Sequence, residues 1–431
     1  MESKPETSPE AAGAPRAAAP PPPVPAAAVR TLLRQGPFTR YITGEGISMT
    51  GTWMQVMAQS WVMTGLTDKA VMLGMVNFAA SIPMIALSMV GGTFADRYSK
   101  RNILLLTQVV QITCAVLLGW LVGTGHIHIW HILTIAFCLG ISGAFEMPAA
   151  SALVPELVGQ DQIATAISFD RAVFHGTRLI GPGLAGYVIS LWGPSSAFYA
   201  NAFSFVALIA ALFTIRPHAT TPEAAKASSR GGMREGFAYV RSDRPTLAMI
   251  GLLSTTVICV FPVPTVMTPL YARNVLGLGP DKMGLLMGLS ASGSLAGALS
   301  LLGVPRRHRR GLLFGAVGGI SLALTGLALA HRFSVAAVSL IALSLGISTL
   351  AGLSQTIVQE RAPGPLRGRV SAIVGLSFFG LMPFAALGIT SVSDGLGMRR
   401  ALVLAALAYL AVATTVLIRA GPHLREPKAG S

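Results

Sequence analysis

The sequence predicts an all-α polytopic membrane protein with twelve transmembrane helices in two six-helix bundles. Of its 431 residues, 52% are hydrophobic and only 11% are charged, whereas a soluble domain carries about 25% charged residues. Apolar runs of roughly 18 or more residues, long enough to cross a hydrocarbon core of ~30 Å, follow one another along the chain. A β-barrel would instead show short segments of alternating polarity.

The first half of the chain begins with a tail and continues with six apolar runs. Residues 1–29 are rich in proline and alanine and have no apolar period, which predicts a disordered cytoplasmic tail. An N-terminal bundle is expected over residues 30–216, with its spans at 40–65, 70–95, 102–124, 129–153, 163–191 and 196–216.

The second half has the same organisation. A polar cytoplasmic linker is expected over residues 217–245, and its stretch MREGFAYV is compatible with a short interfacial helix. A C-terminal bundle over residues 246–420 follows, with spans at 246–271, 281–303, 311–330, 334–357, 368–392 and 399–419. Residues 421–431 are expected to form a second cytoplasmic tail.

Lysine and arginine residues predict the orientation of these spans. With the N-terminus placed in the cytoplasm, about 24 basic residues lie on the cytoplasmic side and about 6 on the other side. This asymmetry explains the formal net charge of +15 as a topology signal and not as a nucleic-acid-binding surface. We therefore expect a multi-pass protein with both termini in the cytoplasm, and the abundance of Ala, Gly, Arg and Pro is typical of a bacterial inner-membrane protein from a GC-rich genome.

The two halves resemble each other at the ends of their fourth and tenth spans. Glu156 and Glu360 each follow a span, precede a short polar turn and are followed by the next helix. The loop between spans 2 and 3 is likewise matched by the loop between spans 8 and 9. Two six-span halves with parallel repeats are the layout of one large class of transporters.

A charged loop, GGTFADRYSKRN, lies between spans 2 and 3. Its residues Gly92, Asp96, Arg97, Lys100 and Arg101 resemble the loop signature of the major facilitator superfamily. The resemblance implies a cytoplasmic gate in which the Asp96 carboxylate lies at the N-terminal dipole of span 11 and latches the two halves together. For the basic residues, a role in topology alone is an open alternative.

Further stretches are similar to the enterobactin-exporter-like and macrolide-efflux-like branch of that superfamily. They include TGEGISMTGTWMQVMAQSWVMTGLT, PAASALVPELV, RLIGPGLAG and QERAPGPLRGRVSAI. Within RLIGPGLAG, Gly181, Pro182 and Gly186 are similar to the hinge signature in span 5 of antiporters. The resemblance implies a transporter that exports its substrate.

Ionisable residues within the spans are the candidates for a proton-coupling site or a substrate cavity. Charge at membrane depth is costly and usually faces a cavity or pairs with another group. A Glu146–Arg171 pair is expected, because both residues lie roughly 10–14 Å from the same end of their antiparallel spans. A static ion pair that holds spans 4 and 5 together is the alternative. The candidates are Glu45, Glu146, Asp170, Arg171, His175 and Arg178.

These observations favour a proton-driven exporter of a small amphipathic molecule, such as a drug, macrolide or siderophore, that works by alternating access. An importer, a uniporter or a lysophospholipid flippase on the same scaffold is the alternative. Because H-E-x-x-H, G-x-S-x-G and P-loop motifs are missing, we expect no enzyme and no ATP-driven pump. The expected partners are the substrate, protons and the lipid bilayer, with no nucleic acid, cofactor or metal, and the chain is expected to be a monomer.

Overall fold

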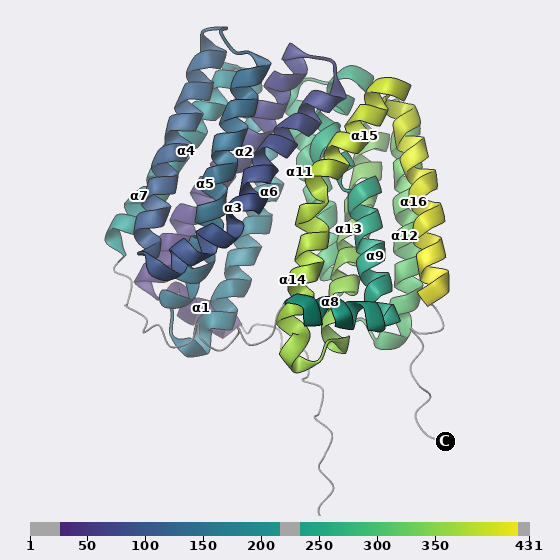
Figure 1. Cartoon of the computed structure of the whole chain (residues 1–431). Coiled ribbons are helices and arrows are strands. Elements are labelled where there is room, and N and C mark those ends of the chain that lie inside the picture. The colour runs from purple at the N-terminus through teal and green to yellow at the C-terminus, as the bar shows by residue number, and fades with distance from the viewer. Residues whose placement is uncertain (1–25, 216–232, 421–431) are drawn as a thin grey trace, which may run out of the picture.

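The computed structural model describes residues 26–215 and 233–420, and these ranges fold into helices that lie in two bundles side by side (Figure 1). The N-terminal half contains α1 (Ala26–Leu33), α2 (Gly36–Leu66), α3 (Ala70–Arg97), α4 (Lys100–Gly123), α5 (Ile129–Glu156), the 3₁₀ turn η1 (Gln160–Gln162), α6 (Ile163–Trp192) and α7 (Pro194–Thr214). Helix α1 begins inside the segment predicted as a tail. The rest of that tail, residues 1–25, lies outside the described residues.

The C-terminal half begins with α8 (Met233–Ser242), the short helix predicted within the linker. The remaining elements are α9 (Arg244–Cys259), the π-helical η3 (Val263–Met267), α10 (Thr268–Leu270), the π-helical η4 (Tyr271–Val275), α11 (Pro280–Leu299), α12 (Arg306–Leu329), α13 (Phe333–Arg361), the 3₁₀ turn η5 (Gly364–Leu366), α14 (Arg367–Gly375), the π-helical η6 (Leu376–Gly380), α15 (Met382–Leu396) and α16 (Met398–Ala420). Residues 216–232 and 421–431 lie outside the described part.

Most of the long helices are apolar enough to span a membrane. In the described ranges, nine helical segments meet this description by length and composition. Helices α2, α6 and α11 also belong to the bundles but carry more polar and small residues. Together with the nine apolar segments, they account for the twelve predicted spans. The chain is therefore a multi-pass membrane protein whose less apolar helices contact other helices of the bundles.

The internal repeat is visible in matching details of the two halves. Gly193 (φ 81°) forms the tight turn between α6 and α7, and Gly397 (φ 87°) forms the corresponding turn between α15 and α16. Glycine adopts this left-handed conformation without the steric cost that a Cβ atom would add. Both predicted glutamates are also paired with a basic residue of the preceding hairpin: Lys100 Nζ lies 2.7 Å from Glu156 Oε1, and Arg309 Nη1 lies 2.9 Å from Glu360 Oε2.

The two halves pack together along α6 and α11 and along α3 and α15. Glycines allow the first of these contacts, because a Cβ atom on Gly186 would lie 2.5 Å from the Pro280 carbonyl oxygen, and one on Gly284 would collide with the Pro182 carbonyl oxygen. Small residues let helix backbones approach closely within a membrane. In Figure 1 the described ends of the chain, helix α8 and the end of α16 lie at one face, which we call the terminal face.

Candidate functional site

A cavity of about 320 Å³ lies between the two halves, mostly among helices of the N-terminal half. Its volume falls within the range of pockets that hold small molecules. The C-terminal half contributes Thr265 and Val266, from the irregular part of span 7. The lining includes the polar residues Thr52, Gln55, Gln59, Ser60, Asn77, Gln111, Glu146 and Asn201.

Glu146 is the predicted site residue that lines this cavity. Its carboxylate accepts hydrogen bonds from the amide groups of Gln108, with Nε2 2.7 Å from Oε1, and of Gln111, with Nε2 2.6 Å from Oε2. Gln108 and Gln111 share one face of α4, because residues three apart lie on the same side of a helix. The expected Glu146–Arg171 ion pair is wrong: the carboxylate is held by neutral donors from α4.

Hydroxyl groups extend the network around Glu146. Ser48 donates to the Gln108 side-chain oxygen at 3.4 Å, and Gln111 Nε2 lies 3.3 Å from Ser142 Oγ. Gln108 is fully buried, so its amide is held in place by these partners. Hydrogen bonds to a charged group contribute about 1.5–3 kcal/mol each, and here they offset part of the cost of burying a carboxylate.

Two further predicted acids lie near this group without lining the cavity. Glu45 lies on α2 and Asp170 lies on α6. The charge of Glu45 interacts with the charges of Glu146 and Asp170. The three carboxylates therefore form one acidic cluster from the first, fourth and fifth spans. Asp170 also interacts with the charge of its neighbour Arg171.

The basic residues of α6 do not line the cavity either. Arg178 stacks its guanidinium over the Trp53 ring, with 5.3 Å between the guanidinium carbon and the ring centroid. His175 packs its ring edge-to-face with Phe174 at 5.5 Å, and both His175 and Arg171 are exposed. These residues lie at the surface of α6 and against α2, so the structure separates them from the Glu146 site.

The predicted hinge residues of span 5 lie at two helix contacts. A Cβ atom on Gly181 would lie 2.5 Å from the Trp53 Cβ of α2, which belongs to the same half. Pro182 and Gly186 face α11 of the other half. The hinge segment therefore connects the packing within one half to the packing between the halves.

The charged loop lies at the terminal face. Lys100 forms the ion pair with Glu156, and the Arg101 guanidinium lies over the Phe213 ring at 5.5 Å. Asp96 makes no hydrogen bond or ion pair with any residue that the structure describes, Arg97 is exposed, and the space next to Gly92 is open. The Asp96 latch stays a prediction, and it is not formed in this conformation.

The hydrogen bonds recorded between the two halves, among the residues that the structure describes, lie at the face opposite the terminal face, and sequence analysis did not single them out. Asp394 of α15 accepts from the backbone N–H groups of Ala70 and Val71 at the start of α3, at 2.6 and 2.9 Å. Asn274 Nδ2 donates to Asp68 Oδ1 at 3.0 Å. Arg273 lies 5.1 Å above the Trp61 ring centroid. We call Asp68, Asn274, Arg273, Trp61, Asp394 and the start of α3 the opposite-face clamp.

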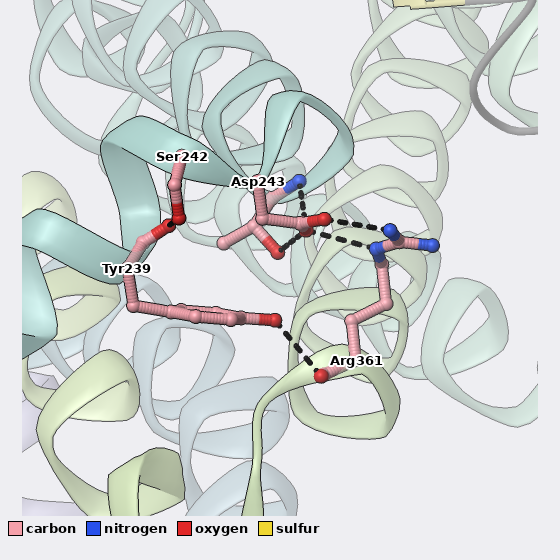
Figure 2. Close-up of polar contacts among 5 residues, drawn as sticks. Tyr239, Ser242, Asp243 and Arg361 are labelled. Atoms are coloured by element: carbon pink, nitrogen blue, oxygen red, sulfur yellow. Dashed lines mark hydrogen bonds and ion pairs between the residues drawn. The ribbon is translucent and has the colours of Figure 1, made fainter.

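A second polar cluster ties the linker helix to the C-terminal bundle (Figure 2). Asp243 binds the Arg361 guanidinium through both oxygens, at 2.6 and 2.8 Å, and caps α9 by accepting from the Thr246 N–H at 3.1 Å. The Tyr239 hydroxyl donates to the Arg361 carbonyl oxygen at 2.8 Å. The hydrogen bonds from Arg361 lower the pKa of the Asp243 carboxyl to about 2.

Sequence analysis missed the carboxamide residues of the cavity. Gln55 and Asn201 bind each other at 2.8 Å, and Gln59, Asn77 and Gln111 complete the set. Because carboxamides carry no charge, a search for ionisable residues passes over them. The usable signal is a Gln or Asn inside an apolar run, since a polar side chain in a membrane helix also needs partners.

Comparisons with known proteins identify the family of this chain. A sequence profile of the family described as transmembrane secretion effector, a group of major facilitator proteins, matches residues 29–429. The chain belongs to this family. It is therefore a major facilitator transporter and not an enzyme, and the resemblance seen in the sequence is confirmed.

Individual relatives agree with this assignment. The transporter is similar to macrolide efflux protein A of Streptococcus pyogenes, with 21% identity over 86% of this chain and 92% of that protein. It is also similar to the multidrug efflux pump Tap of Mycolicibacterium fortuitum, with 22% identity over 92% of this chain and 98% of that protein. The structure of a bacterial homologue of the lysosomal transporter Spinster has the same fold, with a TM-score of 0.69 at 14% identity over 93% of this chain and 99% of that one.

Proposed function

We propose that this transporter is a proton-driven exporter that moves a small amphipathic molecule across the bacterial inner membrane by alternating access. The similarity to efflux proteins supports export. In this proposal the terminal face is cytoplasmic, because the basic residues of the loops gather there, and the chain works as a monomer. The halves 30–216 and 246–420 rock against each other around the cavity.

The position of Glu146 carries the proposal of proton coupling. Its carboxylate lines the cavity, and two amide donors bind it while no cation does so among the described residues. A group held in this way can exchange a proton without breaking an ion pair. Proton binding at Glu146 would also reduce the repulsion with the nearby Glu45, so that the acidic cluster as a whole responds to the proton gradient.

The opposite-face clamp supports alternating access. It joins the halves at one face, whereas Asp96, the predicted latch residue of the terminal face, makes no hydrogen bond or ion pair with the described residues. A transporter needs two such closures that form in turn. We propose that the clamp closes one face while the other is open to the cytoplasm, and that the Asp96 latch closes the cytoplasmic face in the alternative state.

Transport assays in energised vesicles test this function. Inverted vesicles are supplied with macrolides, dyes and siderophores, with and without a protonophore, for the wild type and for Glu146→Gln. Asp161→Asn serves as the matched control, because Asp161 is an exposed carboxylate in the turn after α5. We expect protonophore-sensitive accumulation with the wild type and Asp161→Asn, and its loss with Glu146→Gln.

Other outcomes of the same assay would change the proposal. Accumulation that persists with the protonophore would contradict proton coupling. Movement of substrate only in right-side-out vesicles would indicate an importer. If no compound moves and a fluorescent lysophospholipid changes leaflet instead, the flippase alternative replaces export.

A further inference from the structure

Two carboxamides in the cavity make no hydrogen bond with any residue that the structure describes. Gln59 of α2 is 7% exposed, lines the cavity and makes no hydrogen bond with another described residue. Asn77 of α3 also lines the cavity, and its buried side-chain oxygen has no hydrogen-bond partner among the described residues. Buried polar groups are nearly always hydrogen-bonded. These two amides are therefore the polar groups of the cavity that most need a ligand.

The other carboxamides of the cavity are already used. The Gln55 oxygen accepts from Asn201, whose own oxygen accepts from Ser204 at 3.1 Å. Gln111 donates to Glu146. This division leaves Gln59 and Asn77 as a pair with free hydrogen-bonding capacity on adjacent spans.

The pair lies apart from Glu146 along the bundle. Gln59 is seven residues before the end of α2, and Asn77 is seven residues after the start of α3, so both lie roughly 10 Å from the clamp end of their helices. Glu146 lies seventeen residues into α5, roughly 25 Å from the same end. The amide pair thus lies in the part of the cavity nearer the opposite-face clamp, which Met63 and Leu73 also line, and the carboxylate lies nearer the terminal face.

The charge of the lining limits what can bind. Glu146 is its one ionisable carboxyl group, and no Arg, Lys or His belongs to the described residues that line the cavity. A carboxylate-bearing ligand would lose its hydration, find no cation and meet the charge of Glu146. A neutral hydroxyl or amide group can both donate to and accept from the amides of Gln59 and Asn77.

The rest of the lining is apolar. Methionine and aliphatic side chains adapt to irregular apolar shapes. A ligand that fills this space presents a hydrophobic body next to its polar group. The apolar lining includes Met63, Val76, Met84, Leu139 and Phe205.

We infer that the cargo is an amphipathic molecule without net negative charge, and that Gln59 and Asn77 bind it through an uncharged hydroxyl or amide group. This inference rests on the proposed function, since it names the substrate class of the exporter. The sequence favoured a drug, a macrolide or a siderophore as cargo. The inference excludes siderophores that carry several carboxylates from this set. Gln59 and Asn77 are substrate-binding residues, whereas Glu146 responds to the proton.

Equilibrium binding to the full chain in lipid nanodiscs tests the inference without a gradient. The probes are a hydroxylated macrolide lactone, a citrate-based tricarboxylate siderophore and tetraphenylphosphonium, a cation without hydrogen-bonding groups. We expect the lactone to bind most tightly and the tricarboxylate not to bind. In Gln59→Ala and in Asn77→Ala, the Kd for the lactone should rise roughly tenfold, while binding of the phosphonium changes little.

Ser88→Ala is the matched control, because Ser88 lies on α3 outside the cavity lining and its hydroxyl donates to the Ile85 carbonyl oxygen at 3.0 Å. Its Kd should stay within about twofold of the wild type. Alanine keeps the helix, and the elution profile of each variant checks its fold. If one alanine variant fails to fold, the other still decides the result.

The outcomes separate the inference from the proposed function. Tight binding of the tricarboxylate, unchanged lactone affinity in both alanine variants, or no lactone binding by the wild type would overturn the inference. Lactone binding that depends on Gln59 and Asn77 without any gradient-driven transport would leave the inference standing and remove the exporter. Gradient-driven export of the tricarboxylate would support the exporter and overturn the inference.

Discussion

The carboxylate of Asp394 caps the N-terminus of α3, a helix of the other half, by accepting hydrogen bonds from Ala70 N at 2.6 Å and Val71 N at 2.9 Å. The first N–H groups of a helix lack partners within the helix, and the helix dipole favours a negative charge there. One side chain therefore satisfies two backbone donors that belong to the opposite bundle. This contact makes the closure of one face depend on a single side chain.

Replacement of Asp394 should loosen the opposite-face clamp. Asp394→Ala removes both hydrogen bonds, which at an exposed helix end contribute about 1 kcal/mol, and so should raise the population open at that face several-fold. The measurement is the labelling rate of a cysteine at Leu73, a buried cavity residue, by an impermeant thiol reagent, with Cys114, Cys138 and Cys259 replaced. The neighbouring variant Ser393→Ala is the control, and equal labelling in the two would contradict the clamp.

Removal of the Asp96 charge should destabilise the conformation in which the terminal face is closed. Asp96→Asn is expected to lower the transport rate while membrane insertion and yield stay unchanged, because the predicted latch forms only when the terminal face is closed. Glu235→Gln is a suitable control, since Glu235 is an exposed carboxylate on the same face whose pair with Arg369 is a surface contact. Wild-type transport by Asp96→Asn at equal expression would exclude the latch.

The Asp243–Arg361 contact should make stability depend on pH at the acidic end. The pKa of Asp243 is lowered to about 2 in the folded protein, below the value of about 4 for an unfolded chain. The stabilisation is therefore fully present above about pH 4 and is lost as the pH falls through about 2. Asp243→Asn should lower the Tm in detergent at pH 7, with a smaller difference at pH 3.

The same experiment has an internal comparison. Glu235→Gln removes a carboxylate from an exposed ion pair and should leave the Tm nearly unchanged, because exposed pairs contribute about 0–1 kcal/mol. If Asp243→Asn gave the same Tm difference at both pH values, the stabilisation would not come from the ionised carboxylate.

The glycines between α6 and α11 should be sensitive to one added methyl group. Gly186→Ala places a Cβ atom 2.5 Å from the Pro280 carbonyl oxygen, so the helices must separate, and both the Tm and the transport rate should fall. Gly183→Ala on the same helix meets nothing within 4 Å and should leave both near the wild-type level. A comparable loss in both variants would show that helix propensity, and not the contact between the halves, is responsible.

Much of the architecture was predictable because it depends on properties that are local in the sequence. Apolar length predicted the spans, including the start of the span at Ile129, and the polar turn after Glu156 and Glu360 predicted the repeat that both ion pairs display. The stretch MREGFAYV was compatible with a short helix, and α8 forms there. These features depend on whether each segment lies in lipid or in water, and the polarity of its own residues indicates which.

The candidate site was predicted less completely. Glu146 was identified from its charge, but the expected partner Arg171 was replaced by Gln108 and Gln111, since equal depth in two helices does not decide which faces meet. Asp394 was not among the candidate residues, although it makes the clamp contact with α3. A contact across more than 300 residues leaves no local signal.

The sequence by itself determined that this chain crosses a membrane in two related halves, because hydropathy acts span by span. Only the tertiary structure decided that Gln59 and Asn77 have no hydrogen-bond partner among the described residues, that Glu146 is held by amides, and that the halves are clamped at one face. Such relationships depend on the rotation and tilt of each helix against its neighbours. Packing over the whole bundle sets these angles, and no single segment contains them.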